Sequence, residues 1–134
     1  MNPSCETTVS TVQLMPDGIL LWRYKPGALV GLSEAHEEAA AIKELMDAHG
    51  KVECRLLINI SEIGSIDRAS RRFFASESTH ESFGVRGLAL VMGSPVGTMI
   101  GNIYHAINKT RHPTRLFMSE EKAMSWLVKQ VEAS

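Results

Sequence analysis

Two spacings of apolar positions run along the chain, and they predict strands and helices in turn. Short runs dense in apolar and β-branched residues predict strands over residues 6–15, 19–25, 54–60, 87–92 and 114–118. Apolar residues three and four positions apart predict helices after Ser33, over 68–79, over 95–108 and after Ser119. This order predicts an α/β fold. We expect a single mixed, mostly parallel sheet, opened by an N-terminal β-hairpin and accompanied by about four helices.

The first predicted helix has the two-sided pattern of a helix lying on a sheet. Ser33 is a favoured N-cap residue, and Gly50 supplies a stop. The side predicted to pack on the sheet carries Ala35, Ala39, Ile42 and Met46. The outer side, predicted to face water, carries Glu37, Glu38, Lys43, Glu44 and Asp47.

Composition narrows the class of protein. Of the 134 residues, 44% are hydrophobic and 22% are charged, which suits one core and one domain over residues 1–134. The net charge of -1 argues against a nucleic-acid partner, because such proteins normally carry a basic excess. Residues 1–10 lack the basic and apolar regions of a secretory signal, and no apolar stretch is long enough to span a bilayer. We therefore expect a cytoplasmic protein without membrane insertion.

No residue pattern predicts catalysis, a metal or a cofactor. Cys5 and Cys54 lack the spacing of a metal site, and Cys54 is expected to be a small buried hydrophobe. The five histidines form no zinc-type pair, and no nucleophile elbow is present. We expect no catalytic residues, no metal and no cofactor, and we favour a binding role over an enzymatic one.

Two polar residues stand directly before predicted helices and after predicted strands. Asp67 precedes the helix over 68–79, and Ser94 stands before Pro95 at the start of the next helix. Ligands in open α/β sheets bind at such strand ends, where free amide groups attract anions. Helix capping alone also accounts for both residues, so both interpretations stay open.

Residues 56–70, with the sequence LLINISEIGSIDRAS, resemble the strand–loop–helix signature of STAS domains, the anti-sigma-factor antagonist (SpoIIAA-like) fold. The order of elements over most of the chain is similar as well. The segment 117–127, FMSEEKAMSWL, is similar to that of a bacterial STAS-like group whose function is unknown. The resemblance implies a regulatory or protein-interaction domain without catalysis, with residues 61–70 and the following helix as its contact face.

One departure from that family concerns its phosphorylatable serine. In the family this serine lies two residues after the helix-opening aspartate, which places Ala69 at the position here. Ser70 lies about 100° further round the helix. The acid at the strand end is also replaced, because Asn59 and Ser61 stand near that place. The resemblance therefore implies the family fold without its usual phosphorylation switch.

The binding candidates follow from the contact face and the two helix starts. They are Ser61, Asp67, Arg68, Ser70, Arg71 and Ser94. An alternative function is a small-molecule or anion receptor, with weak enzymatic activity, sited between Asp67 and Ser94. Separately, six arginines would form an anion-binding surface if the fold gathers them, and the alternative is that they are solvated on the protein surface: Arg68, Arg71, Arg72, Arg86, Arg111 and Arg115.

Self-association is a further alternative. The helix over 96–108 is apolar over a wide arc, and Gly97 and Gly101 permit close packing on the sheet or on a second copy. The partner classes left open are therefore a protein, a second copy of this chain and a small anionic ligand.

Overall fold

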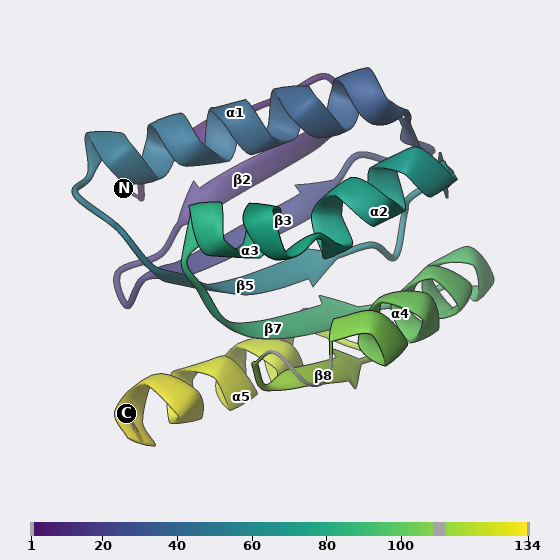
Figure 1. Cartoon of the computed structure of the whole chain (residues 1–134). Coiled ribbons are helices and arrows are strands. Elements are labelled where there is room, and N and C mark those ends of the chain that lie inside the picture. Colours follow the sequence, from purple (N-terminus) through teal and green to yellow (C-terminus); the bar gives the residue numbers. More distant parts are fainter. Residues whose placement is uncertain (1, 109–111, 134) are drawn as a thin grey trace.

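The structure, a computed structural model, describes residues 2–108 and 112–133 and is built around a six-stranded sheet (Figure 1). The strand order is β1-β2-β3-β5-β7-β8, with β1, β2 and β3 antiparallel and the remaining pairs parallel. A second, parallel pair consists of β4 and β6. The strands are β1 Ser4–Glu6, β2 Ser10–Leu14, β3 Ile19–Tyr24, β4 Leu29–Val30, β5 Cys54–Asn59, β6 Ser65–Ile66, β7 Val85–Val91 and β8 Thr114–Phe117.

Helices cover both faces of this sheet (Figure 1). They are α1 Leu32–Ala48, α2 Arg68–Ala75, α3 Glu77–Phe83, α4 Pro95–Asn108 and α5 Glu120–Ala133. Helices α1 to α4 lie on one face, and α5 lies on the other against β5 and β7. Strands β5 and β7 are therefore covered on both sides, which explains their nearly continuous apolar sequence. The predicted α/β fold class, with its N-terminal hairpin and mostly parallel sheet, is confirmed.

The predicted strand over 6–15 is confirmed over residues 10–14, where β2 lies, and a further strand, β1, precedes it. Strands β1 and β2 pair with Cys5 opposite Val12, and the chain reverses between them at residues 7–9. The Thr7 hydroxyl accepts hydrogen bonds from the amides of Val9 and Ser10. The Thr7 side chain thus stabilises a turn that contains neither glycine nor proline, the residues that usually indicate a turn in a sequence.

Helix α1 begins one residue before the expected cap. Gly31 is the N-cap, and its amide donates to the Glu34 carboxylate at 2.9 Å. Ser33 already lies inside the helix and donates its hydroxyl to Glu34 at 2.6 Å. The hydrogen bond from the Gly31 amide to the Glu34 carboxylate therefore fixes the start of α1. The expected stop is confirmed, since Gly50 follows the helix with a left-handed φ of 66°.

The predicted helix over 68–79 is two helices, so the described residues form five helices where about four were expected. The backbone of Ser76 is extended, with φ -69° and ψ 147°, which ends α2 at Ala75. The Ser76 hydroxyl then accepts from the amide of Thr79 and caps α3. The polar stretch after Ala75 favours this new start over a continued helix.

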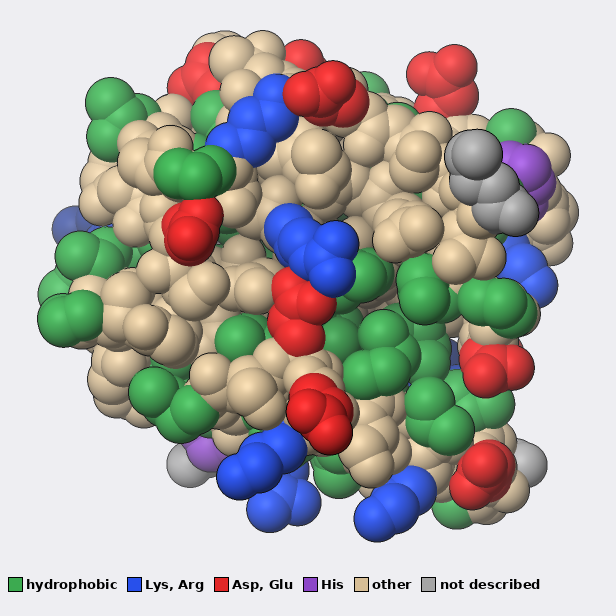
Figure 2. All heavy atoms as spheres, turned by 180° about the vertical axis from the view of Figure 1, so that it is seen from behind, with side chains coloured by type: hydrophobic (Ala, Val, Ile, Leu, Met, Phe, Trp, Pro, Cys, Tyr) green, Lys and Arg blue, Asp and Glu red, His purple; other side chains and the backbone are tan. Residues whose placement is uncertain are grey.

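The face on the far side of the sheet mixes charges. Figure 2 shows acidic and basic side chains next to one another there, in keeping with the net charge of -1. One such pair joins β3 to α5, with the Arg23 guanidinium 2.7 Å from the Glu120 carboxylate. Within the described part of the chain, no helix is both long and apolar enough to cross a membrane.

Candidate functional site

Asp67 caps α2, as predicted. Its Oδ1 accepts from the Ser70 amide at 2.7 Å. Hydrogen bonds from the side chain and the backbone of Ser70 hold the pKa of Asp67 below its ordinary value. The backbone of Leu32, at the start of α1, also donates to Asp67, so this carboxylate ties the first turns of α1 and α2 together.

The residues after Asp67 divide between surface and interior. Arg68 and Ala69 are exposed. Ser70 is fully buried, and its hydroxyl donates to the Val30 carbonyl at 3.5 Å. The guanidinium of Arg71 donates to the Ile66 carbonyl at 2.8 Å. A partner that reaches this turn therefore meets Arg68 and Ala69 but not Ser70.

Three of the six arginines predicted as an anion-binding set line one groove. Arg68, Arg71 and Arg72 line a groove of about 360 Å³ together with Ser76 and with Ile103 of α4. Arg86 instead pairs with Glu53 at the start of β7. Arg115 lies over the Phe117 ring, and Arg111 lies outside the described residues. The fold thus gathers half of the predicted anion-binding set.

Ser61 and Ser94 lie apart from this groove. The Ser61 hydroxyl donates to Asn59, whose amide nitrogen donates to Glu120 on the α5 side. The Arg23 side chain holds the pKa of Glu120 below its ordinary value. A Cβ on Gly93 would lie only 2.6 Å from that of Ser61, so the two strand ends touch here.

Asp67 and Ser94, between which an anion receptor site was predicted, each cap the helix that follows them. The Ser94 hydroxyl accepts from the Gly97 amide at 2.9 Å and caps α4, as Asp67 caps α2. Within the described residues, no hydrogen bond or ion pair joins Asp67 to Ser94. Gly97 packs against the chain's own Met92 and Ile60 carbonyls, where a Cβ would lie at 2.2 and 2.9 Å.

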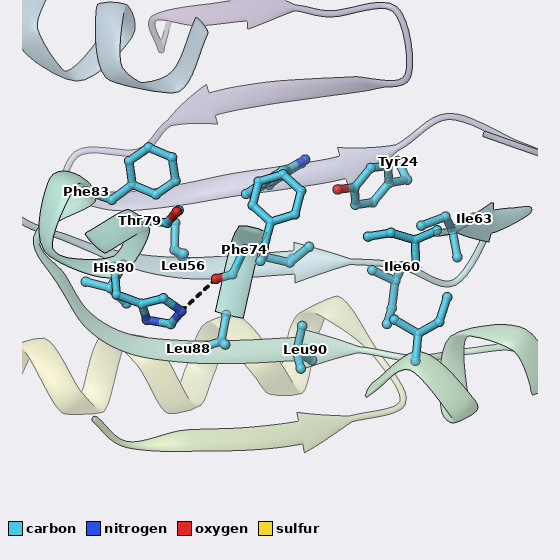
Figure 3. A pocket seen from close by; sticks show the side chains of 15 residues that line it. Tyr24, Leu56, Ile60, Ile63, Phe74, Thr79, His80, Phe83, Leu88 and Leu90 are labelled. Carbon is cyan, nitrogen blue, oxygen red and sulfur yellow. Dashed lines mark hydrogen bonds between the residues drawn. The ribbon is translucent and has the colours of Figure 1, made fainter. Parts of the chain in front are cut away.

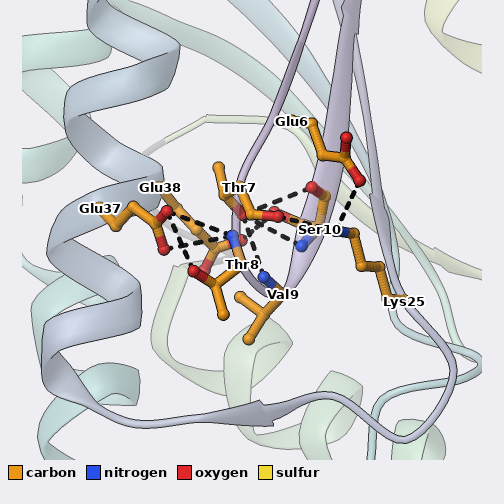
Figure 4. A network of polar contacts seen from close by, with 8 residues as sticks. All are labelled: Glu6, Thr7, Thr8, Val9, Ser10, Lys25, Glu37 and Glu38. Carbon is orange, nitrogen blue, oxygen red and sulfur yellow. Dashed lines mark hydrogen bonds and ion pairs between the residues drawn. The ribbon is translucent and has the colours of Figure 1, made fainter.

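The prediction that Glu38 lies on the outer side of α1 is wrong, because its side chain is fully buried. Its carboxylate accepts from the Ser10 hydroxyl at 2.6 Å, the Trp22 indole at 2.8 Å and the Tyr24 hydroxyl at 3.1 Å. Figure 4 shows Glu38 pointing from α1 toward the turn between β1 and β2, while Glu37 reaches Thr8. Burial raises the pKa of Glu38 to about 7, although the three hydrogen bonds oppose the rise.

The sequence did hold a signal for Glu38. It stands three residues after Ala35 and four before Ile42, on the same helical face as both. The prediction of an exposed Glu38 followed from its charge and not from its position on the helix. The Cys54 prediction is confirmed, since the thiol is buried and burial raises its pKa to about 12.

A cavity of about 40 Å³ lies between the sheet and helices α2 and α3. Figure 3 shows Phe74 over its middle, Tyr24 and Ile63 toward one end, and Phe83 and His80 toward the other. Among its 15 lining residues, only Trp22, Tyr24, Thr79 and His80 carry a polar side-chain atom. No sequence motif pointed to this cavity, because its walls come from seven separate elements and the loop after β5.

Both ring nitrogens of His80 have hydrogen-bond partners. Its Nε2 donates to the Phe74 carbonyl at 2.8 Å, and its Nδ1 lies 2.9 Å from Nε2 of His112. Because a carbonyl only accepts, the neutral His80 carries its proton on Nε2, and His112 then donates to His80. The two rings stack with centroids 5.0 Å apart. Within the described residues, no group of three metal-binding side chains is present.

Comparison with known families assigns the chain. A family model described as a domain of unknown function, DUF7793, matches residues 13–131. The chain belongs to the DUF7793 family. The matched range begins within β2 and includes every cavity wall, α2 and the Glu38 position, so these features lie inside the DUF7793 domain.

One solved structure agrees with the fold of this DUF7793 member. A protein of the DUF3478 family with a SpoIIAA-like fold, from Shewanella loihica PV-4, is 12% identical with a TM-score of 0.62, over 95% of each chain. The predicted SpoIIAA-like fold is thereby confirmed. A protein of unknown function from Arthrobacter sp. FB24 is 26% identical over 87% of this chain and 97% of its own, with a TM-score of 0.30. No curated protein matches.

Proposed function

We propose that this chain is a non-catalytic protein-interaction domain whose contact face is the first turn of α2 with residues 61–70. The observation that carries the proposal is the exposed surface of Arg68, Ala69 and Arg72 on α2. Leu29 is 68% exposed and Leu32 is 41% exposed where β4 and α1 adjoin this turn. Apolar side chains rimmed by charged ones are typical of protein interfaces.

The arginines indicate the chemistry of the partner. Arg68, Arg71 and Arg72 line one groove, and arginine forks bind carboxylates in pairs of hydrogen bonds. We infer that the partner presents an acidic segment to this groove and an apolar side chain to Leu29 and Leu32. The SpoIIAA-like fold supports a regulatory role by analogy alone.

Photo-crosslinking tests this face. A benzophenone amino acid at Ala69 is expected to give a discrete adduct in cells of the source organism, and the same group at the exposed Ala48 is the matched control. Arg68→Glu with Arg72→Glu should abolish the adduct, while Lys122→Glu with Lys129→Glu on α5 should leave it. An adduct that survives the arginine reversal, or that forms equally from Ala48, contradicts the proposal.

We propose further that this face works without a phosphorylation switch on α2. The position that carries the hydroxyl in the related family is Ala69, and the neighbouring Ser70 is buried beneath Val30. Mass spectrometry of the protein from its own cells should find Ser70 unmodified. Phosphate on Ser70 overturns this part of the proposal.

An anion receptor is the second candidate, and the same arginine groove favours it. A small anion that binds only the folded chain raises the melting temperature. Inorganic phosphate and nucleotides should then stabilise the wild type but not the Arg68→Glu, Arg72→Glu variant. No response from either class of anion rules out this candidate.

A further inference from the structure

Exposed apolar side chains gather at one end of the molecule. Strands β3, β5, β7 and β8 are parallel, so their carboxyl ends form one edge of the sheet, on the right in Figure 1. Six large apolar side chains are exposed in the described residues, and all but Val52 follow one of these strand ends in the chain. The five are Leu29, Leu32, Val96, Met99 and Met118. Exposed apolar side chains gathered in one area, and not scattered singly, indicate an interaction site.

Charged side chains of both signs accompany the apolar ones. Arg68 and Arg72 are exposed on α2, and Glu121 is exposed in the first turn of α5, shortly after Met118. Within the part of the chain that the structure describes, no hydrogen bond or ion pair engages the side chains of these three charged residues. Helix α2 covers one face of the sheet and α5 covers the other (Figure 1). The two bases and the acid therefore lie on opposite sides of the row of strand ends.

This placement is complementary to itself. In a two-fold symmetric dimer the same surface of both copies forms the contact. An axis along the row of strand ends puts the α2 side of one copy against the α5 side of its partner, and the reverse contact occurs at the same time. Glu121 of each copy then meets the groove that Arg68, Arg71 and Arg72 line on the other. The apolar side chains of both copies pack against one another in the same contact.

We propose that the partner of this face is a second copy of the chain, held across the carboxyl edge of the sheet by Glu121 and the α2 arginines. The inference rests on the proposed function, because it uses the same contact face and names its partner. The second copy supplies what that face was inferred to recognise, namely an exposed apolar side chain at Met118 followed by the acidic first turn of α5.

The mixture of charges favours a second copy over other occupants. An anionic membrane surface selects an excess of basic residues, but Glu62 and Glu121 are exposed at the same end as the arginines. A separate, purely acidic partner would place Glu121 against charge of its own sign, which opposes binding. The second copy provides an acidic group for the basic ones and a basic surface for the acidic one.

Charge reversal on each side of the contact tests the dimer. Sedimentation equilibrium of the purified chain at several concentrations should show a reversible dimer. Arg68→Glu with Arg72→Glu should weaken it at least about tenfold, and so should Glu121→Arg, because like charges then meet across the interface. Lys129→Glu, further along α5, is the control and should leave the dimer unchanged. All four positions are exposed, so the circular dichroism and melting temperature of the variants should match those of a wild-type monomer.

A mixture of the two variants shows whether these side chains meet. When the Arg68→Glu, Arg72→Glu chain pairs with the Glu121→Arg chain, one contact has its charges exchanged and the other is native. The mixed dimer should therefore form at least about tenfold more tightly than either variant pairs with itself. Native mass spectrometry with one variant isotopically labelled measures this preference. A loss of structure in either variant cannot produce such a recovery.

Distinct results overturn the dimer and the contact face. A chain that stays monomeric up to its solubility overturns the dimer, as does a dimer that the reversals leave intact or a mixture that shows no recovery. A monomeric chain that binds vesicles of phosphatidylglycerol overturns it as well. The adduct from Ala69 separates the two proposals, because a second copy gives twice the mass of the chain. An adduct with a different protein overturns the dimer and leaves the contact face in place, whereas no adduct contradicts the face itself.

Discussion

The spaces under α1 and under α2–α3 lie on the same face of the sheet and treat polar groups in opposite ways. Under α1, the Glu38 carboxylate gathers three donors with no room between them. Under α2 and α3, the few polar side chains that line the cavity make their hydrogen bonds to other parts of the protein. Trp22 and Tyr24 belong to both regions, since their polar atoms face Glu38 and their rings line the cavity. The same two residues of β3 therefore anchor one helix and shape the space beneath the next two.

Removal of the acceptor in the polar region should have the largest effect. Glu38→Ala leaves the indole of Trp22 and the hydroxyls of Ser10 and Tyr24 without their shared partner. Because an unsatisfied buried donor costs about 1–3 kcal/mol, we expect the free energy of unfolding to fall by about 3–5 kcal/mol in urea titrations. The control is Glu37→Ala on the exposed side of α1, with a loss below about 1 kcal/mol. Equal small losses in both variants would contradict the role of Glu38.

The pH dependence of stability should be nearly as large. The pKa of Glu38 rises from 4.5 to about 7 on folding, so between these values the folded state holds a proton that the unfolded state has lost. Stability from this group is therefore highest below pH 4.5 and falls by about 3 kcal/mol as pH rises to 7. Glu38→Gln removes this dependence, and the difference between wild type and variant cancels the other carboxylates. Parallel stability curves for the two proteins would show that Glu38 is not the source.

Overpacking should distinguish the unfilled cavity from a filled part of the core. Leu88 faces the cavity, whereas Leu57 is fully buried against α5 on the other face. Leu88→Phe should stay within about 1 kcal/mol of wild type, while Leu57→Phe should cost about 1–3 kcal/mol. The reverse order in chemical denaturation would mean that the cavity is not available space.

The joint between α2 and α3 should give the smallest effect. Ser76→Ala removes the cap of α3 and should cost about 1 kcal/mol. Hydrogen exchange should then quicken in α3 while α1 keeps its protection. The matched change Ser125→Ala is exposed within α5, so its exchange pattern is expected to equal that of wild type.

Sequence periodicity was sufficient for most of the fold. The runs in β5 and β7 and the spacing in α4 and α5 are strong because packing on a sheet imposes them. The β4–β6 pair was missed, since two-residue strands whose partners are 36 positions apart leave no local pattern. The break at Ser76 was also missed. Ser76 is a favoured N-cap residue, but the helix predicted around Phe73 and Phe74 was continued past it.

The candidate site was only partly predictable. Asp67 and Ser94 were identified as helix caps from their positions alone. Glu38, His80 and the cavity depend on which elements meet in space, and nothing near Glu38 in the sequence shows that Ser10, Trp22 and Tyr24 donate to it. Contacts of this kind follow from topology and not from local preference.

Xenon under pressure tests most directly whether the space beneath α2 and α3 is dry and apolar, because xenon occupies dry apolar cavities. In a crystal of the wild-type chain, the anomalous signal of xenon is predicted between Phe74, Trp22 and Leu88, and Leu88→Phe should remove it. Ordered water at that position, or a cavity that takes up no xenon, would contradict the account.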